Sequence, residues 1–147
     1  MRIIDRFSSE HDVFLGQLEA IEGLTRNDTA VDEIVAALRI LAAPLLIHAE
    51  NEEAALFPDL EPSMGVGGGP LAILTEEHVT IHGQIDRLTG GPTRGELTQV
   101  LEAFASLLRA HITKEEEILF PAAAQILGDE RLARLDRDIK RAAVGVT

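Results

Sequence analysis

The chain has 147 residues, a formal net charge of −12, no Cys, no Trp and no Tyr, and 46% hydrophobic residues. This length fits one domain, and the apolar content is sufficient for a buried core, which argues against a disordered chain. Without Cys, the chain cannot form disulfides, iron–sulfur clusters or cysteine-ligated zinc sites. The acidic excess disfavours nucleic acid as a partner.

The hydropathy pattern shows neither a leader peptide nor a membrane span. The first residues lack the apolar run of a signal peptide. No apolar stretch approaches the ~18 residues that a membrane helix needs. We therefore expect a cytoplasmic protein with no membrane partner.

Apolar residues recur at spacings of three and four residues through most of the chain, which is the pattern of one-sided helices. The stripes predict four long helices at roughly 3–26, 30–57, 70–89 and 95–120. A turn at 27–29, a flexible connection at 61–70 and Gly90-Gly91-Pro92 separate them. The pairs Phe57-Pro58 and Phe120-Pro121 should end the second and fourth helices, because a residue before Pro avoids the α region.

Two further features lie within or beyond these helices. Pro44 falls inside the second predicted helix, where we expect a kink. Residues 129–142 carry Leu132, Leu135 and Ile139 on one face, which predicts a shorter fifth helix.

The chain contains an internal repeat. Residues 48–58 (HAENEEAALFP) match residues 111–121 (HITKEEEILFP), with six identities at a separation of 63 residues. A fainter match aligns Glu10-His11 with Glu77-His78, 67 residues apart. Two similar helical hairpins predict an all-α fold, an up-down-up-down four-helix bundle with a short C-terminal fifth helix. We expect residues 1–128 to form the bundle and residues 129–147 a helix and tail packed on it.

All five His fall on or beside the apolar stripes, as do two Glu. These candidate site residues are His11, His48, Glu52, His78, His82, His111 and Glu115. A buried, unpaired carboxylate costs several kcal/mol, and a bound metal ion compensates that cost directly. The pairs could instead be ordinary contacts on helix surfaces, worth a few tenths of a kcal/mol.

The spacing of these residues favours the metal interpretation. Three pairs lie four residues apart, which places both side chains on one helix face, one turn apart. The pairs are His48/Glu52, His78/His82 and His111/Glu115. Imidazole with carboxylate suits iron, with zinc, copper and manganese as competitors.

Other segments that look like functional motifs lack the residues that those functions require. The Gly-rich stretch at 65–69 lacks the Lys-Ser/Thr of a phosphate-binding loop, and the segment 78–82 lacks the Glu of a zinc protease. No Glu-x-x-His occurs, which argues against a ferritin-like carboxylate site. Four acidic residues beside the stripes are predicted to be solvated: Glu50, Glu53, Glu116 and Glu117.

The ordered set of motifs over about residues 5–121 resembles the hemerythrin-like, HHE cation-binding family. The matching motifs are His11, His48-x3-Glu52, His78-x3-His82, His111-x3-Glu115 and the two Glu-Glu-x-x-Leu-Phe-Pro tails. The resemblance implies a non-haem di-iron centre, bridged by carboxylates and by an oxo or hydroxo group. One iron would be bound by His78, His82 and His111 and the other by His11 and His48, with Glu52 and Glu115 bridging.

The internal repeat also predicts that the two irons have unequal numbers of histidine ligands, because Leu15 in the first hairpin aligns with His82 in the second. One metal then has three imidazoles and the other has two, and the poorer metal keeps an open position for O2, peroxide, NO or water. Two departures from the family matter. Glu115 stands near where the animal oxygen carriers use Asp, and the absence of Cys weakens the link to members that repair iron centres.

Three hypotheses about function follow. The first is a binding protein whose di-iron centre takes up O2 or a related ligand for storage, transfer or sensing of oxygen or iron. The second is an enzyme that decomposes peroxide or reduces NO at the same iron. The third is an interaction module loaded with zinc or another divalent metal. The helix at 129–142 should pack Leu132 and Leu135 on the bundle or on a second copy in a homodimer; the alternative is that its basic residues bind a membrane or an acidic partner.

Overall fold

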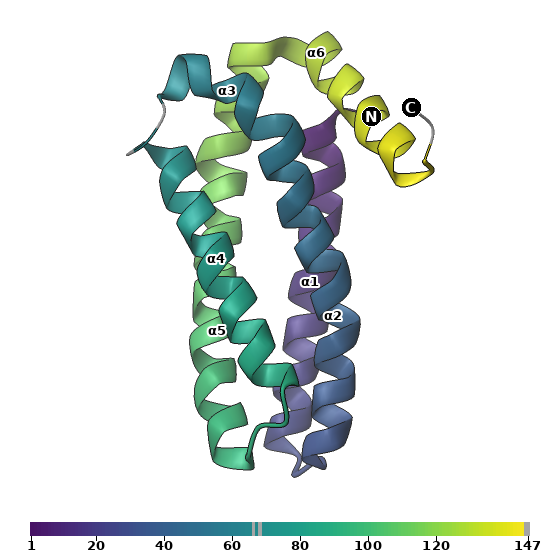
Figure 1. The fold of residues 1–147 in the computed structure, drawn as a ribbon, viewed down its shortest axis with the longest axis vertical. Coiled ribbons are helices and arrows are strands. Elements are labelled where there is room, and N and C mark those ends of the chain that lie inside the picture. Colours follow the sequence, from purple (N-terminus) through teal and green to yellow (C-terminus); the bar gives the residue numbers. More distant parts are fainter. Residues whose placement is uncertain (66, 68, 146–147) are drawn as a thin grey trace.

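Four helical rods run alternately up and down, each beginning close to the start of its apolar stripe (Figure 1). The computed structural model describes residues 1–65, 67 and 69–145. Over these residues there is no strand, so the expected all-α four-helix arrangement is confirmed. None of the helices in this part of the chain combines the length and apolar content that crossing a membrane requires.

The rods differ in how many helical elements they contain. The first is α1 (Ile3–Arg26) and the third is α4 (Pro70–Thr89). The second joins α2 (Val31–Asn51), the π-helical turn η1 (Glu52–Leu56) and α3 (Phe57–Met64). The fourth joins α5 (Arg94–Lys114), the π-helical turn η2 (Glu115–Leu119) and α6 (Phe120–Ala143).

The two Phe-Pro pairs do not end helices, contrary to our expectation. A π-helical turn precedes each proline, and in it Phe57 N–H donates to the Glu52 carbonyl and Phe120 N–H to the Glu115 carbonyl. Each proline then falls in the first turn of the next α-helix, where its missing N–H costs little. The second rod therefore extends to Met64, and the connection expected at 61–70 shrinks to 65–69, of which 66 and 68 lie outside the described residues.

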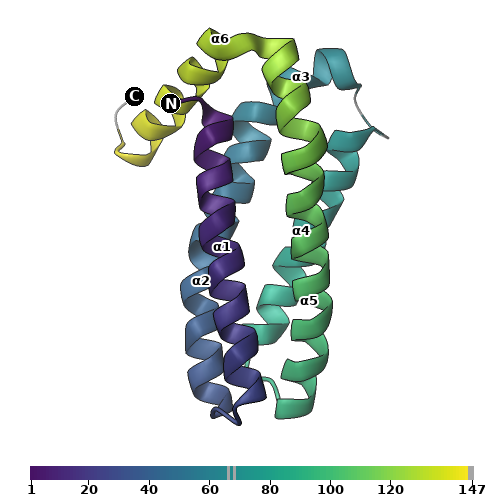
Figure 2. The ribbon, with the colours of Figure 1, turned by 180° about the vertical axis from the view of Figure 1, so that it is seen from behind.

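The expected fifth helix is not a separate element, although residues 129–142 are helical. Residues 129–142 are the second half of α6, which continues from η2 and changes direction at Gly128. That glycine has φ 75° and ψ 164°, a conformation that side-chain-bearing residues rarely adopt. Figure 2 shows α6 rising from α5 and turning over the end of the bundle. Pro44 is contained within α2, which continues past it to Asn51.

Two apolar clusters fill the bundle, one above the other. The lower cluster includes Phe14, Leu18, Leu41, Leu88 and Phe104, and the upper one includes Ile3, Phe7, Leu56, Phe120 and Leu132. In every rod, residues of the two clusters flank a short stretch that carries His, or His and Glu. The layer between the clusters is therefore where the polar side chains are buried.

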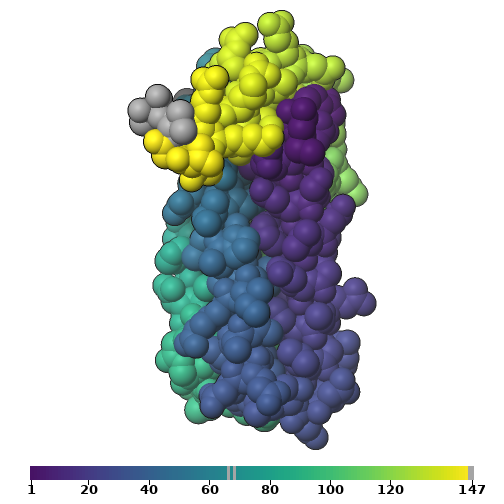
Figure 3. Space-filling model, turned by 90° about the vertical axis from the view of Figure 1, so that its right-hand side faces the viewer, coloured from purple at the N-terminus to yellow at the C-terminus, as the bar shows by residue number. Residues whose placement is uncertain are grey.

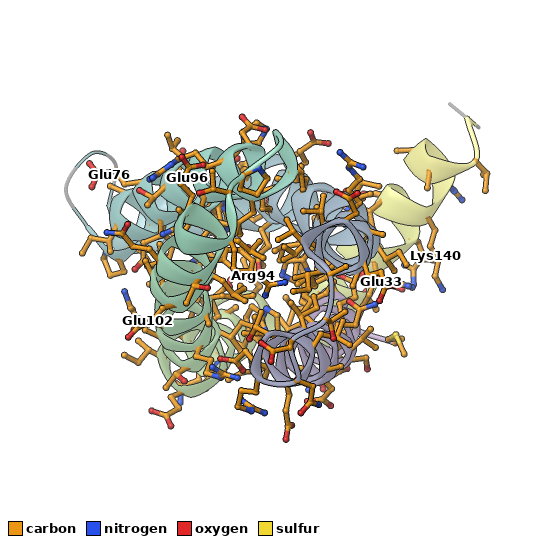
Figure 4. The ribbon with its side chains drawn as sticks, turned by 90° about the horizontal axis from the view of Figure 1, so that it is seen from below. Glu33, Glu76, Arg94, Glu96, Glu102 and Lys140 are labelled. Carbon is orange, nitrogen blue, oxygen red and sulfur yellow. The ribbon has the colours of Figure 1, made fainter. Side chains whose placement is uncertain are left out.

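Two hydrogen bonds from arginine side chains to backbone carbonyls join the two hairpins toward the lower end of the bundle. Arg94 donates to the Thr29 carbonyl at 2.7 Å, and Arg39 donates to the Thr89 carbonyl at 3.0 Å. Figure 4 views this end and shows Arg94 among the chain turns, with the apolar side chains filling the space between the rods. These bonds join the two hairpins at a point remote from the polar layer.

The second half of α6 covers the upper end of α1 and of the second rod (Figure 3). Leu132 and Leu135 join the upper cluster. Arg6 donates to both oxygens of the buried Asp136, and Arg131 donates to Asp59. Lys140 lies 3.6 Å from Asp136. Two basic residues of this segment, Arg131 and Lys140, thus pair with acidic residues of the same chain.

Replacing Asp136 with Asn should destabilise the protein at neutral pH by about 2 kcal/mol, since the buried carboxylate that pairs with Arg6 is lost. Burial opposes ionisation, but the hydrogen bonds from Arg6 outweigh it and lower the pKa of Asp136. The contribution is therefore complete above the ordinary pKa of Asp and is lost as the pH falls through the lowered value. Urea unfolding at pH 7 and pH 3 measures this. A destabilisation equal at both pH values would contradict the role of the charge.

Candidate metal centre

Each of the four rods contributes one buried histidine to the layer between the apolar clusters. These are His11 of α1, His48 of α2, His78 of α4 and His111 of α5. The apolar stripe of each helix places them there, because every one of these His occupies a stripe position. The structure therefore buries these four residues in one layer, as the apolar stripes predict.

The four imidazoles form two pairs of closely similar geometry. Nε2 of His11 lies 3.1 Å from Nε2 of His48, and Nε2 of His78 lies 3.2 Å from Nε2 of His111. In both pairs the ring centroids are 4.8 Å apart and the rings are inclined at 54°. The internal repeat of the sequence is therefore expressed as an approximate two-fold relation between the two halves of the centre.

Glu52 and Glu115 lie between the two pairs, and both are fully buried. Oε1 of Glu52 is 2.9 Å from Nε2 of His48, and its Oε2 is 3.1 Å from Nε2 of His78. Oε1 of Glu115 is 2.8 Å from Nε2 of His111 and 3.6 Å from Nε2 of His11. Each carboxylate thus faces both halves of the centre.

The π-helical turns begin at these two glutamates. Buried residues of the second rod follow one another at intervals of four: His48, Glu52, Leu56 and Leu60. On an α-helix each step of four turns about 40° further around the axis, and a π-helical turn, which contains more residues, offsets part of that drift. The turn therefore lets one rod present the carboxylate to the polar layer and the following Leu to the upper cluster.

The carboxylates lack the hydrogen bonds that their burial requires. All four oxygens of Glu52 and Glu115 are buried and have no hydrogen-bond partner within the part of the chain that the structure describes. An unsatisfied buried carboxylate is expensive, and a cation is the most direct compensation. The donor atoms form two sets within 4.8 Å, namely His11, His48, Glu52 and Glu115, and Glu52, His78 and His111. Two buried His/Glu clusters that share Glu52 are consistent with a binuclear metal site.

A second ring of carboxylates faces the outer nitrogens of the four histidines. Nδ1 of His48 is 2.5 Å from Glu10, and Nδ1 of His111 is 3.1 Å from Glu77. The corresponding distance from Nδ1 of His11 to Glu116 is 2.7 Å, whereas from Nδ1 of His78 to Glu53 it is 3.5 Å. Such carboxylates fix the ring orientation and leave Nε2 free for a metal.

Sequence reasoning missed this second ring. Glu53 and Glu116 were expected to be solvated, yet Glu116 bonds to His11 and Glu53 lies beside His78. Glu10 and Glu77 were not singled out for a role. The signal was present in the repeat, because its two alignments relate Glu10 to Glu77 and Glu53 to Glu116, but only the packing of the rods shows which His each one meets.

The electrostatics of the centre follow from burial and carboxylate proximity. Burial opposes the charged form of His48, but Glu52 and Glu10 outweigh it and raise the pKa of His48 to about 10. The same balance, with Glu115 as the main partner, raises the pKa of His111. Burial and the neighbouring Glu115 raise the pKa of Glu52. Burial also opposes the ionisation of Glu115, but the neighbouring Glu52, His11 and His111 outweigh it and hold the pKa of Glu115 well below its usual range. Protons therefore occupy part of the centre at neutral pH in the metal-free chain.

Aromatic rings pack directly on the imidazoles. Phe120 stacks on His11 and Phe57 on His78, at interplanar angles of 8° and 5°. Phe7 meets His48 edge-on. These rings exclude water from the upper side of the polar layer, where electrostatic interactions are strengthened as a result.

His82 is not brought into the cluster. Its side chain is 58% exposed, and its Nδ1 lies 3.4 Å from Asp86. Ile81 takes the inward position on α4, and the next residue points about 100° away from it. In the structure each half of the centre thus has two imidazoles, in place of the expected three and two. Leu15, which aligns with His82, packs against the lower cluster.

An enclosed cavity adjoins the centre on its lower side. Its volume is about 20 Å³, and its walls include all four buried histidines. The other lining residues are apolar: Leu45, Leu46, Ala49, Ile81, Leu108 and Ile112. This volume holds about one water-sized molecule.

Comparison with known proteins gives one family match. The model of the Hemerythrin HHE cation binding domain matches residues 2–123. Neither the curated proteins nor the solved structures give a significant match to the chain.

Loading a divalent cation at pH 7 should release about one proton per chain or more, because ligating imidazoles must be neutral. The carboxylates that raise the pKa of His48 to about 10 keep it protonated in the metal-free chain. Cation affinity should therefore increase as the pH rises from 7 toward 10. The stabilising effect of this protonation on the metal-free chain is complete below the ordinary His pKa and is lost toward pH 10. A pH indicator in weak buffer measures the proton release. Cation loading without proton release would contradict this electrostatic description.

Replacing Glu77 with Gln should weaken cation binding by about 10–100-fold, since His111 loses the carboxylate that orients it. Isothermal titration with Co(II) measures the affinity. Glu76→Gln is the matched control, because the neighbouring side chain is exposed and the charge change is identical. Equal effects of the two substitutions would indicate a general charge effect without orientation of His111.

Proposed function

This chain belongs to the family of hemerythrin HHE cation-binding domains, and on that premise we propose that it is a non-haem di-iron protein that binds O2 or a related small ligand. The proposed metal ligands are His11, His48, Glu52, His78, His111 and Glu115. Storage, transfer or sensing of oxygen or iron are the roles open to such a centre.

The observation that carries the proposal is the position of Glu52. Its two oxygens face different imidazole pairs, at 2.9 Å and 3.1 Å, and neither has a hydrogen-bond partner within the described residues. A carboxylate in this position can serve two cations at once. Imidazole nitrogens and carboxylate oxygens together are a donor set that suits iron.

The residues around the centre would determine which molecules reach it. The enclosed cavity of about 20 Å³ touches all four histidines and is otherwise apolar. It has room for about one water-sized molecule, which favours a diatomic ligand over an organic substrate. Iron, when bound, supplies coordination positions and redox chemistry that can act on such a molecule. The apolar walls keep bulk water away, and the outer carboxylates hold the imidazoles in place.

The proposal assigns no ligand role to His82, since its side chain points to solvent in the structure. This differs from the ligand set that the sequence resemblance implies. His82→Ala and His48→Ala therefore form a discriminating pair of substitutions.

Anaerobic reconstitution with Fe(II), followed by exposure to O2, tests the proposal. Wild-type protein and His82→Ala should each hold two irons per chain and develop visible charge-transfer bands. His48→Ala should hold fewer irons. Because the chain has neither Trp nor Tyr, near-ultraviolet bands of the centre will also be measured against little protein absorbance.

Three results would contradict the proposal. Fewer than two irons per chain in the wild type would refute the di-iron centre. Zinc in protein purified from iron-rich medium would favour the metal-loaded interaction module. Steady turnover of peroxide or NO, lost in His48→Ala, would favour the enzyme.

A further inference from the structure

A surface groove between α2 and α4 opens next to the buried His78. Its volume is about 390 Å³, and Leu46, Ala49, Glu50 and Glu53 line one side, with His78, Val79 and His82 on the other. Leu46, Ala49 and His78 also line the enclosed cavity. These three side chains are therefore the wall between solvent and the centre.

We propose that this groove is the entrance through which divalent cations reach the centre, with Glu50, Glu53 and His82 as the docking groups at its mouth. This inference rests on the proposed function, because it concerns how the same centre is loaded. It also gives a role to His82, which the ligand set leaves unused.

The outer ring of carboxylates is incomplete on this side. Three buried histidines have a carboxylate within 3.1 Å of Nδ1, whereas Nδ1 of His78 is 3.5 Å from Glu53. His78 is more than nine-tenths buried, and its Nδ1 has no hydrogen-bond partner within the described residues. Glu53 is 38% exposed and faces the groove. The Glu53 carboxylate therefore lies between solvent and the buried His78 and forms no hydrogen bond with that imidazole.

Within the described residues, the opposite face of the bundle keeps a counterpart of Glu53, namely Glu116, which bonds to His11, but it lacks counterparts of the other two docking groups. By the repeat, His82 corresponds to Leu15, Glu50 to Thr113 and Leu46 to Arg109. Arg109 forms an ion pair with Glu22, so this face carries a cation where the groove has an apolar wall. The two halves of the centre are alike in their imidazoles, but among the described residues the exposed imidazole lies on the α2–α4 face, together with two carboxylates.

The chemistry of the groove suits a cation in transit better than a permanently bound one. The donor atoms of Glu50, Glu53 and His82 do not come together within 4.8 Å of one another in the described structure. A hydrated divalent cation would be attracted by the two carboxylates, exchange water for an imidazole of His82, and pass to His78. Negative charge at a cleft raises association rates by about 10–10³-fold.

Stopped-flow loading with Co(II), followed by its visible absorbance, tests the entrance. Glu50→Gln/His82→Ala should load about tenfold more slowly than the wild type. Its final stoichiometry should remain two ions per chain. Glu102→Gln is the control for charge, since this exposed residue lies on α5, away from the groove (Figure 4), and should load at the wild-type rate.

A second substitution tests the wall independently of charge. Leu46→Phe should slow loading by narrowing the passage beside His78, and Leu46→Ala should accelerate it. Raising the salt concentration should slow loading of the wild type more than that of the Glu50→Gln/His82→Ala variant, because exposed charges are screened.

The outcomes separate this inference from the proposed function. A wild type that never binds two Co(II) ions would contradict the di-metal centre itself. Full binding at an unchanged rate in both the double variant and Leu46→Phe would overturn the entrance alone. A fall to one ion per chain in His82→Ala would make His82 a permanent ligand, which would also overturn the docking role.

Discussion

Two carboxylates buried in the middle of a helical bundle are the constraint on which this structure depends. Glu52 and Glu115 have no solvent contact and no hydrogen-bond partner within the described residues, and they lie between four imidazoles. A layer of this kind is costly in an apolar interior unless a cation compensates it. The bundle accommodates it by dividing its core into two apolar clusters, with the polar layer between them. The π-helical turns allow the same rods to serve both the layer and the upper cluster.

The approximate two-fold relation of the hairpins gives the centre its regularity, and the surface breaks that regularity. Within the polar layer, the imidazole pairs agree in distance and inclination. Outside it, His82 lies on one face and Leu15 on the other. A repeat constrains buried positions strongly, because both halves must fill the same layer at close packing. Exposed positions carry no such constraint. Differences in how divalent cations reach the two halves of the centre therefore arise at the surface.

The upper end of the bundle is covered in part by residues beyond the family match, which ends at residue 123. The second half of α6 brings Leu132 and Leu135 onto Ile3 and Phe7. Phe7 meets His48, and Phe120 at the start of α6 stacks on His11, so this apolar cover lies directly on the polar layer. This covering contributes to the exclusion of water, which makes every charge interaction in the layer stronger.

The amino-acid sequence by itself determined the helices, the repeat and most of the buried donors. Apolar periodicity located the rods, and the spacing of His48 with Glu52 and of His111 with Glu115 placed each pair on one helix face. These features are local, so they can be read without knowing how the rods pack. The tertiary structure decided what depends on neighbours: that Pro58 and Pro121 follow π-helical turns, that outer carboxylates from other rods meet the imidazoles, and that Ile81 points inward in place of His82. The physical reason is that a residue at the edge of a stripe faces core or solvent according to the helix packed against it, which the periodicity of a single helix does not specify.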